Sequence, residues 1–308
     1  MIDYTIIIAH KNSPELLQYC LDSIPVREDG QVIVVDDDSS AEIVDFEHFP
    51  RWKGAHYQFF FTKEGKGAGY ARNVGLEHAE GKWVFFLDAD DYLLPEVNEI
   101  FDEEKETDAD IIFFRTKAVM LEDRRSYSKR GDFYNRLVDQ YLASSDERMI
   151  RSLWLSAANK FFRLKFLQDH GIRADEIRYS NDCFFSVKAG VCAEKIAVRE
   201  KMYYCITESG SSLTSNFKKK PGELQMRADA FFRSQLYLFD HGYSIDEKSS
   251  FSFLRDLFSR DRKAFVLNFN RMLKMGYKKA QLLREVFKNN GRLAFCKRFL
   301  YAYLVTGM

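Results

Sequence analysis

An apolar run ends abruptly in carboxylates at Phe85-Phe86-Leu87-Asp88-Ala89-Asp90-Asp91. The run begins at Lys82 and predicts a strand buried on both faces, so the acidic residues belong to the turn after its carboxyl end. Carboxylates this close repel one another unless a cation compensates them. Oxygen ligands suit Mg²⁺ or Mn²⁺, and these ions suit diphosphates. The alternative interpretation is a polar turn whose acids cap the next helix.

The pattern of strand followed by acids also occurs earlier, at Gln31–Val35 and Asp36-Asp37-Asp38. Other strands are predicted at Tyr4–Ala9, Tyr57–Phe61 and Asp110–Arg115, and helices after Pro14, over Tyr70–Ala79 and after Pro95. Alternating strands and helices indicate an α/β protein with a mostly parallel sheet flanked by helices. Because ligands bind beyond the carboxyl ends of such strands, we expect both acidic turns to contribute to one site.

The periodic pattern loosens from about residue 130, where strand pieces are predicted at Lys195–Val198 and Met202–Ile206. After Pro221-Gly222 the chain is predicted to be helical to its end. A length of 308 residues allows two domains. We therefore predict a catalytic domain over residues 1–215 and a helical C-terminal region over residues 216–308.

The charge is balanced overall, with 46 Lys and Arg against 46 Asp and Glu, but it is unevenly distributed. Residues 1–110 contain 9 basic and 25 acidic residues, which disfavours nucleic-acid binding and favours a cation site. The five cysteines form no CxxC pair, which indicates reduced thiols and a cytoplasmic location. We see no secretory signal and no apolar stretch long enough to span a bilayer. Histidine-bound zinc, a GxSxG hydrolase and a Walker-type phosphate loop find no support.

Four ordered motifs together resemble the family 2 glycosyltransferases, which have the Rossmann-like GT-A fold. They are Ile6–Asn12, Val34–Ser40, Gly67–Gly75 and Phe86–Asp91. The resemblance is strong over residues 3–115 and faint over residues 150–215. It implies inverting transfer of a sugar from a nucleotide-diphosphate donor, usually a UDP-sugar, with residues 1–115 binding the nucleotide sugar and residues 116–215 the acceptor.

The resemblance also implies roles on the nucleoside side of the site. Ala9 and His10 would line the nucleoside pocket, and Asp36 or Asp37 would bind the base. Gly67 would let the backbone approach the nucleotide, although a flexible connector between strand and helix explains this glycine as well.

At the diphosphate, the resemblance gives Arg72 a contact with the nucleotide, Asp88 a contact with ribose or metal, and Asp90 the role of metal ligand. Mn²⁺ or Mg²⁺ held there would neutralise charge on the departing diphosphate. The alternative for Arg72 is a surface arginine that pairs with the nearest carboxylate.

Inverting transfer needs a base for the acceptor hydroxyl, and Asp182 within Arg178–Phe185 is the candidate. The preceding residue is Asn181, where the family more often has Glu. Asp182 could instead cap the helix that follows. Trp154 and Asn159–Arg163 resemble the acceptor side of these enzymes, and packing of their aromatic rings in the core is the alternative.

From Arg271 onward the chain has nine basic residues and one acid, Glu285, interleaved with apolar residues. These apolar residues are Phe287, Leu293, Phe295, Phe299, Leu300, Tyr301, Tyr303 and Leu304. Such a segment resembles an interfacial helix on an anionic membrane, which would suit a lipid-linked acceptor. The alternative is a helix whose aromatic residues pack on the rest of the protein.

We therefore predict a cytoplasmic glycosyltransferase of surface-polysaccharide assembly that acts on a glycan or lipid-linked acceptor, with peripheral membrane contact through its C-terminus and no nucleic-acid partner. One alternative is a phosphohydrolase of the haloacid-dehalogenase type that uses Asp88 and Asp90. That group usually places its DxD motif after the first strand, whereas here it follows about the fourth. The other alternative is a binder of nucleotide sugars without catalytic activity.

Overall fold

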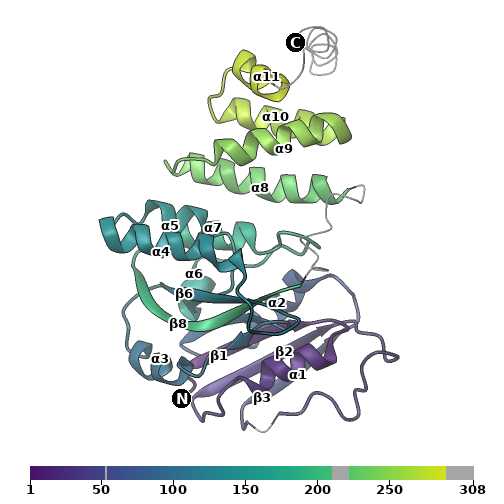
Figure 1. The fold of residues 1–308 in the computed structure, drawn as a ribbon, viewed down its shortest axis with the longest axis vertical. Coiled ribbons are helices and arrows are strands. Elements are labelled where there is room, and N and C mark those ends of the chain that lie inside the picture. The colour runs from purple at the N-terminus through teal and green to yellow at the C-terminus, as the bar shows by residue number, and fades with distance from the viewer. Residues whose placement is uncertain (53, 210–221, 289–308) are drawn as a thin grey trace. The chain divides into compact units, whose positions relative to one another are not determined.

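The computed structural model describes residues 1–52, 54–209 and 222–288. The chain divides into two compact units, Met1–Asn216 and Phe217–Met308 (Figure 1). Each unit has a hydrophobic core of its own.

An eight-stranded sheet forms the centre of the first unit. Its strands are β1 (Tyr4–His10), β2 (Gly30–Asp37), β3 (Tyr57–Thr62), β4 (Trp83–Asp88), β5 (Tyr92–Leu93), β6 (Ile111–Met120), β7 (Lys160–Arg163) and β8 (Ile196–Glu208). They lie in the order β3-β2-β1-β4-β7-β6-β8-β5. Four neighbouring pairs are parallel and three are antiparallel. The predicted α/β class with a mostly parallel sheet is confirmed.

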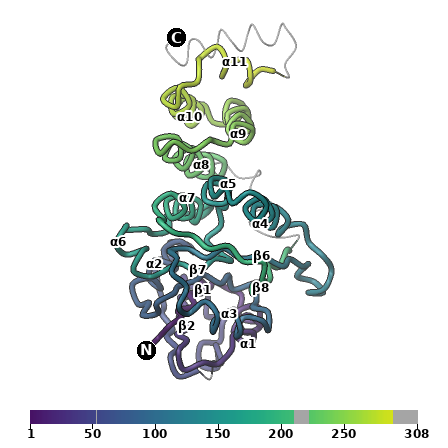
Figure 2. Tube along the Cα trace, turned by 90° about the vertical axis from the view of Figure 1, so that its left-hand side faces the viewer, coloured from purple at the N-terminus to yellow at the C-terminus, as the bar shows by residue number. Residues whose placement is uncertain are grey.

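Helices cover both faces of this sheet (Figures 1 and 2). They are α1 (Pro14–Asp22), α2 (Ala68–Glu77), α3 (Val97–Glu104), the 3₁₀ turn η1 (Lys129–Gly131), α4 (Asp132–Ser144), α5 (Arg148–Leu153), α6 (Leu164–Asp169) and α7 (Cys183–Cys192). On β1, Ile6 and Ile8 belong to the core cluster that includes Leu17 of α1. Ile7 belongs to the opposite cluster, which includes Leu76 of α2. Side chains alternate between the faces of a strand, so a continuous apolar run is what a doubly covered sheet requires.

The sequence interpretation differs from the structure in the later strands. The two predicted pieces at residues 195–198 and 202–206 form one strand, β8. The charged residues 199–201 break the apolar pattern, but backbone pairing with β6 continues past them through a shift in register. The predicted strand at residues 110–115 extends to Met120, and the short strand β7 was missed.

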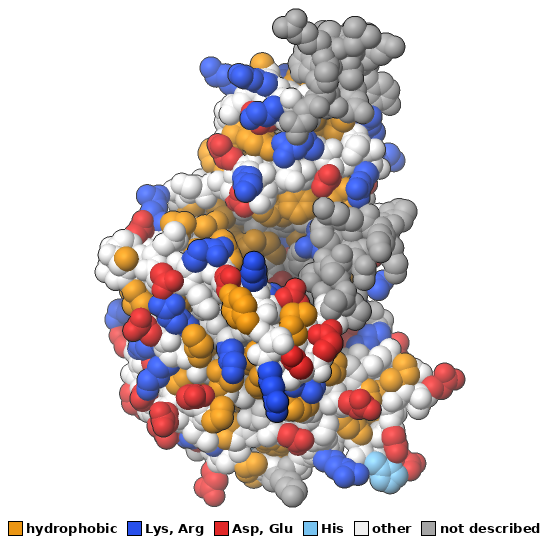
Figure 3. Space-filling view, in the orientation of Figure 1, with side chains coloured by type: hydrophobic (Ala, Val, Ile, Leu, Met, Phe, Trp, Pro, Cys, Tyr) orange, Lys and Arg blue, Asp and Glu red, His pale blue; other side chains and the backbone are white. Residues whose placement is uncertain are grey.

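Four helices make up the described part of the second unit, namely α8 (Glu223–Asp240), α9 (Glu247–Arg260), α10 (Arg262–Lys274) and α11 (Lys279–Phe287). Phe287 is buried in their core, where its ring meets that of Phe258 edge-on. Exposed basic residues on the last two helices include Lys263, Lys274, Lys279 and Arg284, and Figure 3 shows Lys and Arg side chains at the surface there. The residues predicted to contact a membrane from Leu293 onward lie outside the described part of the chain.

Among the helices that the structure describes, none combines the length and the apolar character that crossing a bilayer requires.

Helix α2 lies directly against the loop that precedes α7. The Asn73 side chain donates to the Ala174 carbonyl at 3.0 Å and accepts from the Ala174 amide at 2.9 Å. Gly69 approaches the same loop so closely that a Cβ atom at this position would lie 1.9 Å from the carbonyl oxygen of Asp175. The glycine-containing helix therefore fixes the position of the loop that leads to Asp182.

We expect Gly69→Ala to destabilise the first unit by about 1–3 kcal/mol, because the added methyl group must displace backbone rather than a flexible side chain. The matched control is Gly30→Ala, where a Cβ atom would make only an ordinary contact at 3.5 Å. Thermal unfolding checks the difference. Equal midpoints for the two variants would show that the loop does not pack against α2 as described.

Candidate active site

Strands β1, β2 and β4 end together, and this places both acidic turns at one edge of the sheet. His10 at the end of β1 is level with Asp36 of β2, and Ala9 is level with Asp88 of β4. Since β1 lies between β2 and β4, the two turns are about 10 Å apart, two strand spacings. The alternation of strands and helices correctly predicts this convergence.

Strand β8 holds the turn at residues 88–91 by four hydrogen bonds. The Tyr204 hydroxyl donates to Asp91 Oδ2 at 2.7 Å and accepts from the Asp88 amide at 3.1 Å. The Thr207 amide donates to Asp91 Oδ1 at 2.7 Å, and its hydroxyl donates to the Asp90 carbonyl at 2.6 Å. Sequence analysis missed Tyr204 and Thr207, because they lie more than 110 residues away and no motif marks them.

The three carboxylates of this turn lie close enough to bind one cation. One oxygen from each of Asp88, Asp90 and Asp91 lies within 4.8 Å of the others. Burial, together with the charges of Asp90 and Asp88, raises the pKa of Asp91 well above its usual value. Both of its oxygens already accept hydrogen bonds, so Asp88 and Asp90 are the carboxylates open to a ligand.

Asp90 has solvent-exposed surface, but many protein atoms lie around its carboxyl group and partly bury it. This burial, with the charge of Asp88 added, raises the pKa of Asp90 to about 6. A divalent cation would relieve the repulsion between the two carboxylates, and their oxygen ligands suit Mg²⁺ or Mn²⁺. The donor set therefore fits the predicted metal.

Arg72 of α2 joins this turn to the residue before Asp182. Its guanidinium donates to Asp88 Oδ1 and to Asn181 Oδ1, each at 2.6 Å. Arg72 is buried, and burial opposes its charge, but the carboxylates of Asp88 and Asp182 outweigh that effect and raise the pKa of Arg72. Arg72 is therefore not a surface arginine, but it does pair with a carboxylate as that alternative expected.

On the nucleoside side, His10 and Asp36 are built into the protein. His10 Nδ1 lies 2.7 Å from Asp36 Oδ2, and the Ser13 amide donates to His10 Nε2 at 3.2 Å. This network assigns the ring proton to Nδ1. Burial opposes the ionised form of Asp36, but hydrogen bonds from His10 and Ser39 prevail and lower its pKa. Both side chains are almost fully buried, so they shape the edge of the sheet from within.

Asp37 connects β2 to the glycine loop. Its Oδ2 accepts from the Gly67 amide at 2.8 Å, and its carbonyl accepts from Lys11 Nζ at 2.7 Å. Gly67 has a φ of 96°, which only glycine adopts readily. A Cβ atom there would lie 3.7 Å from the Ile177 carbonyl oxygen, so this loop approaches protein backbone. Ala9 lies between the two acidic turns on β1.

Asp182 occupies the N-cap position of α7, but its side chain makes no capping hydrogen bond. Its Oδ2 instead accepts from the Ala157 amide at 3.3 Å. The helix-cap alternative therefore does not account for this carboxylate. The rings of Trp154, Phe161 and Phe162 are buried in the core, so the packing alternative holds for them.

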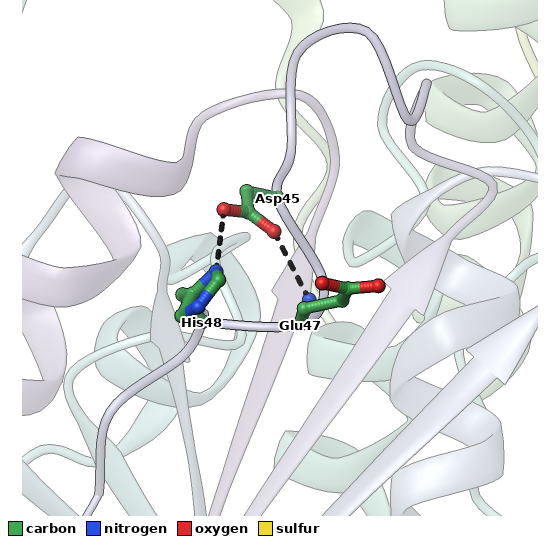
Figure 4. A group of neighbouring side chains, drawn as sticks. All are labelled: Asp45, Glu47 and His48. Atoms are coloured by element: carbon green, nitrogen blue, oxygen red, sulfur yellow. Dashed lines mark hydrogen bonds and ion pairs between the residues drawn. The ribbon is translucent and has the colours of Figure 1, made fainter.

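A second group that could bind a cation lies on the connection between β2 and β3 (Figure 4). Asp45 Oδ2 pairs with His48 Nδ1 at 2.8 Å, and Asp45 Oδ1 accepts from the Glu47 amide at 3.2 Å. All three residues are exposed. Hydrogen bonds within the turn already explain their arrangement, and we assign no site to them.

Comparison with known proteins concerns the family and the fold of the chain. The family model described as "Glycosyl transferase family 2" matches residues 5–170. The poly(ribitol-phosphate) beta-N-acetylglucosaminyltransferase TarS of Staphylococcus aureus is 27% identical over 231 residues, 70% of this chain and 38% of TarS. The glycosyltransferase EpsH of Bacillus subtilis, described as putative, is 22% identical over 70% of this chain and 64% of its own. The chain thus spans less than two thirds of the length of these relatives.

A crystal structure of S. aureus TarS (residues 1–349) in complex with UDP-GlcNAc resembles the chain with a TM-score of 0.65. The match covers 99% of this chain and 91% of that one, at 20% sequence identity. At this identity the likeness concerns the fold, and it confirms the predicted GT-A architecture.

We expect Tyr204→Phe to destabilise the protein by about 1–3 kcal/mol, because it leaves the buried Asp91 oxygen without its hydroxyl donor. Tyr203→Phe is the matched control. The Tyr203 hydroxyl is buried without a hydrogen-bond partner, so its removal should be neutral or stabilising. Thermal unfolding of both variants measures the contrast. An equal loss of stability in both would contradict the proposed support of the turn by β8.

Proposed function

The chain belongs to glycosyl transferase family 2 and is a glycosyltransferase, and we propose that it transfers a sugar from a UDP-linked donor to an acceptor hydroxyl. The proposed transfer proceeds with inversion and uses a divalent cation. One observation carries the proposal. Two open carboxylates, Asp88 and Asp90, lie at the same edge of the sheet as Asp37, and a buried arginine connects Asp88 to the turn that contains Asp182.

The donor would extend along this edge. Its nucleoside would lie by Ala9 and the turn at Asp37, with His10 and Asp36 supporting that turn from inside, and its diphosphate by Asp88 and Asp90. A bound cation would supply positive charge to the departing diphosphate. Arg72 adds a permanently charged, planar donor group beside Asp88. Gly67 contributes by fixing the loop that bonds Asp37.

In the transfer step, the Asp182 carboxylate takes the proton of the acceptor hydroxyl. The acceptor oxygen forms a bond to the anomeric carbon of the donor sugar. The bond between that carbon and the β-phosphate oxygen breaks, and its electron pair leaves with the nucleoside diphosphate. The products are the glycosylated acceptor, the nucleoside diphosphate and protonated Asp182.

The names of two relatives indicate a class of acceptor. TarS and a Bacillus spizizenii relative are named as enzymes that add N-acetylglucosamine or glucose to poly(ribitol-phosphate). We propose a cell-surface glycopolymer or a lipid-linked precursor as the acceptor here. Two predictions stand beside this proposal. The first unit divides into a donor half, residues 1–115, and an acceptor half, residues 116–215, and the protein is located in the cytoplasm.

A panel of nucleotide sugars tests the donor assignment. In the presence of Mn²⁺ or Mg²⁺, we expect at least one UDP-sugar to raise the unfolding temperature, since a ligand that binds only the folded state stabilises it. The same donor should be hydrolysed slowly without an acceptor. Stabilisation by GDP- or CMP-sugars alone would overturn the UDP assignment.

We expect Asp90→Ala to abolish divalent-dependent UDP binding and transfer while the fold is retained, because the variant loses one of two open carboxylates. Isothermal titration with UDP, with and without Mn²⁺, measures the effect. Asp45→Ala, in the exposed turn of Figure 4, is the control and should bind as the wild type does. Full activity of Asp90→Ala would contradict the site.

Asp182→Asn should reduce kcat by at least about 100-fold with little change in donor affinity, because a general base acts in the transition state. The control is Asp169→Asn, which alters an exposed carboxylate paired with Lys165. Normal turnover by Asp182→Asn would remove the assigned base. If the wild-type protein binds UDP normally but forms no product with any acceptor, the result would favour the alternative of a non-catalytic binder.

A further inference from the structure

Lys160 is a buried cation that the proposed mechanism does not use. It is the first residue of β7, is level with Phe113 of β6, and is 1% exposed. The ring centroids of Phe113, Trp154 and Phe162 lie 5.5, 5.9 and 5.3 Å from its Nζ atom. Within the described residues, its one hydrogen-bond acceptor is the Trp154 carbonyl oxygen, at 3.4 Å. Lysine is rarely buried without a partner, so this placement calls for an explanation.

The hydrogen bond of Lys160 leads along the backbone to Asp182. Trp154 follows α5 and begins the loop at residues 154–159. Three residues later, the Ala157 amide donates to Asp182 Oδ2 at 3.3 Å. The ammonium group of Lys160 and the carboxylate of Asp182 therefore hold two points of the same short loop.

The two groups also interact through their charges. Burial lowers the pKa of Lys160 to about 7, and the negative charge of Asp182 acts in the opposite direction. Lys160 is thus protonated below about pH 7, the range in which a carboxylate titrates. A nearby positive charge favours the ionised form of a carboxylate, which is the form that a general base requires.

We propose that Lys160 is a positioning residue for Asp182, because its ammonium group fixes the loop whose amide binds the carboxylate and supplies a positive charge that favours the ionised base. The inference rests on the proposed function, in which Asp182 takes the acceptor proton.

Arg72 and Tyr134 also interact with Asp182. Arg72 of α2 acts on Asp182, but its guanidinium is bonded to Asp88 and Asn181. Tyr134 of α4 is neutral, since burial and Asp182 raise its pKa to about 12. Lys160 has no carboxylate partner other than Asp182 among the charges that act on it. Removing Lys160 therefore removes a positive charge that acts on Asp182.

Lys160→Met tests the proposal, because methionine suits the surrounding aromatic rings and lacks the charge. We expect the thermal stability of the variant to be unchanged or higher and its donor KM to stay within about twofold of the wild-type value. Its kcat at pH 6 should be about tenfold lower. The acidic limb of its kcat profile should shift upward by about 0.5–1 pH unit. Lys165→Met, which alters an exposed lysine, is the control. Wild-type kcat with an unshifted acidic limb would overturn the proposal.

A second measurement needs no variant at Lys160 and therefore does not depend on how well that variant folds. With ¹³C-labelled lysine side chains, NMR should show one lysine that titrates near pH 7. Asp182→Asn should lower the midpoint of that lysine's titration by about 0.5 pH unit or more, because coupling between two sites is reciprocal. An unchanged midpoint would overturn the inference and leave the proposed function standing. Full transfer activity of Asp182→Asn would overturn the proposed function, and the role of Lys160 with it.

Discussion

The guanidinium of Arg72 joins two turns that are more than 90 residues apart in the chain. It is buried, and a buried charge is tolerated only where oppositely charged or polar groups satisfy it. Asp88 supplies the charge and Asn181 supplies a neutral acceptor, each at 2.6 Å. Because Asn181 is uncharged, Arg72 is hydrogen-bonded to one carboxylate rather than two, and Asp182 acts on it through its charge. In the proposed complex, a divalent cation bound by Asp88 would leave the positive charge of Arg72 available to the diphosphate.

The acidic turn shows how three neighbouring carboxylates can share a small space. Asp91 receives two hydrogen bonds from β8 and is buried, and Asp88 pairs with Arg72. Asp90 has neither kind of partner in its side-chain contacts among the described residues, and burial, followed by the charge of Asp88, raises its pKa. These hydrogen bonds and the ion pair stabilise the turn, and the crowding of Asp88 and Asp90 still favours a cation. Hydrogen bonds from a distant strand make that balance achievable.

Sequence reasoning succeeded where local pattern determines structure. The apolar runs at β1, β2 and β4 are buried on both faces, and the rule that parallel strands share a carboxyl edge placed Asp37, Asp88 and Asp90 together. It failed where tertiary contacts decide. Nothing local reveals that Tyr204 bonds Asp91, that Gly69 approaches the backbone at Asp175, or that the histidine at the end of β1 is internal. These depend on segments that meet only after folding.

The charges around Asp182 suggest why the second half of the first unit carries so few recognisable motifs. Its contributions are single groups on unrelated elements, namely an amide before β7, a buried lysine within β7 and a tyrosine on α4. The amide acts on the Asp182 carboxylate by a hydrogen bond, and the lysine acts by its charge, which extends over several ångströms inside protein. Such groups need no fixed spacing in the sequence. The proposed donor side differs, because a cation and a diphosphate would require several ligands at defined positions, and short motifs on neighbouring strands would provide them.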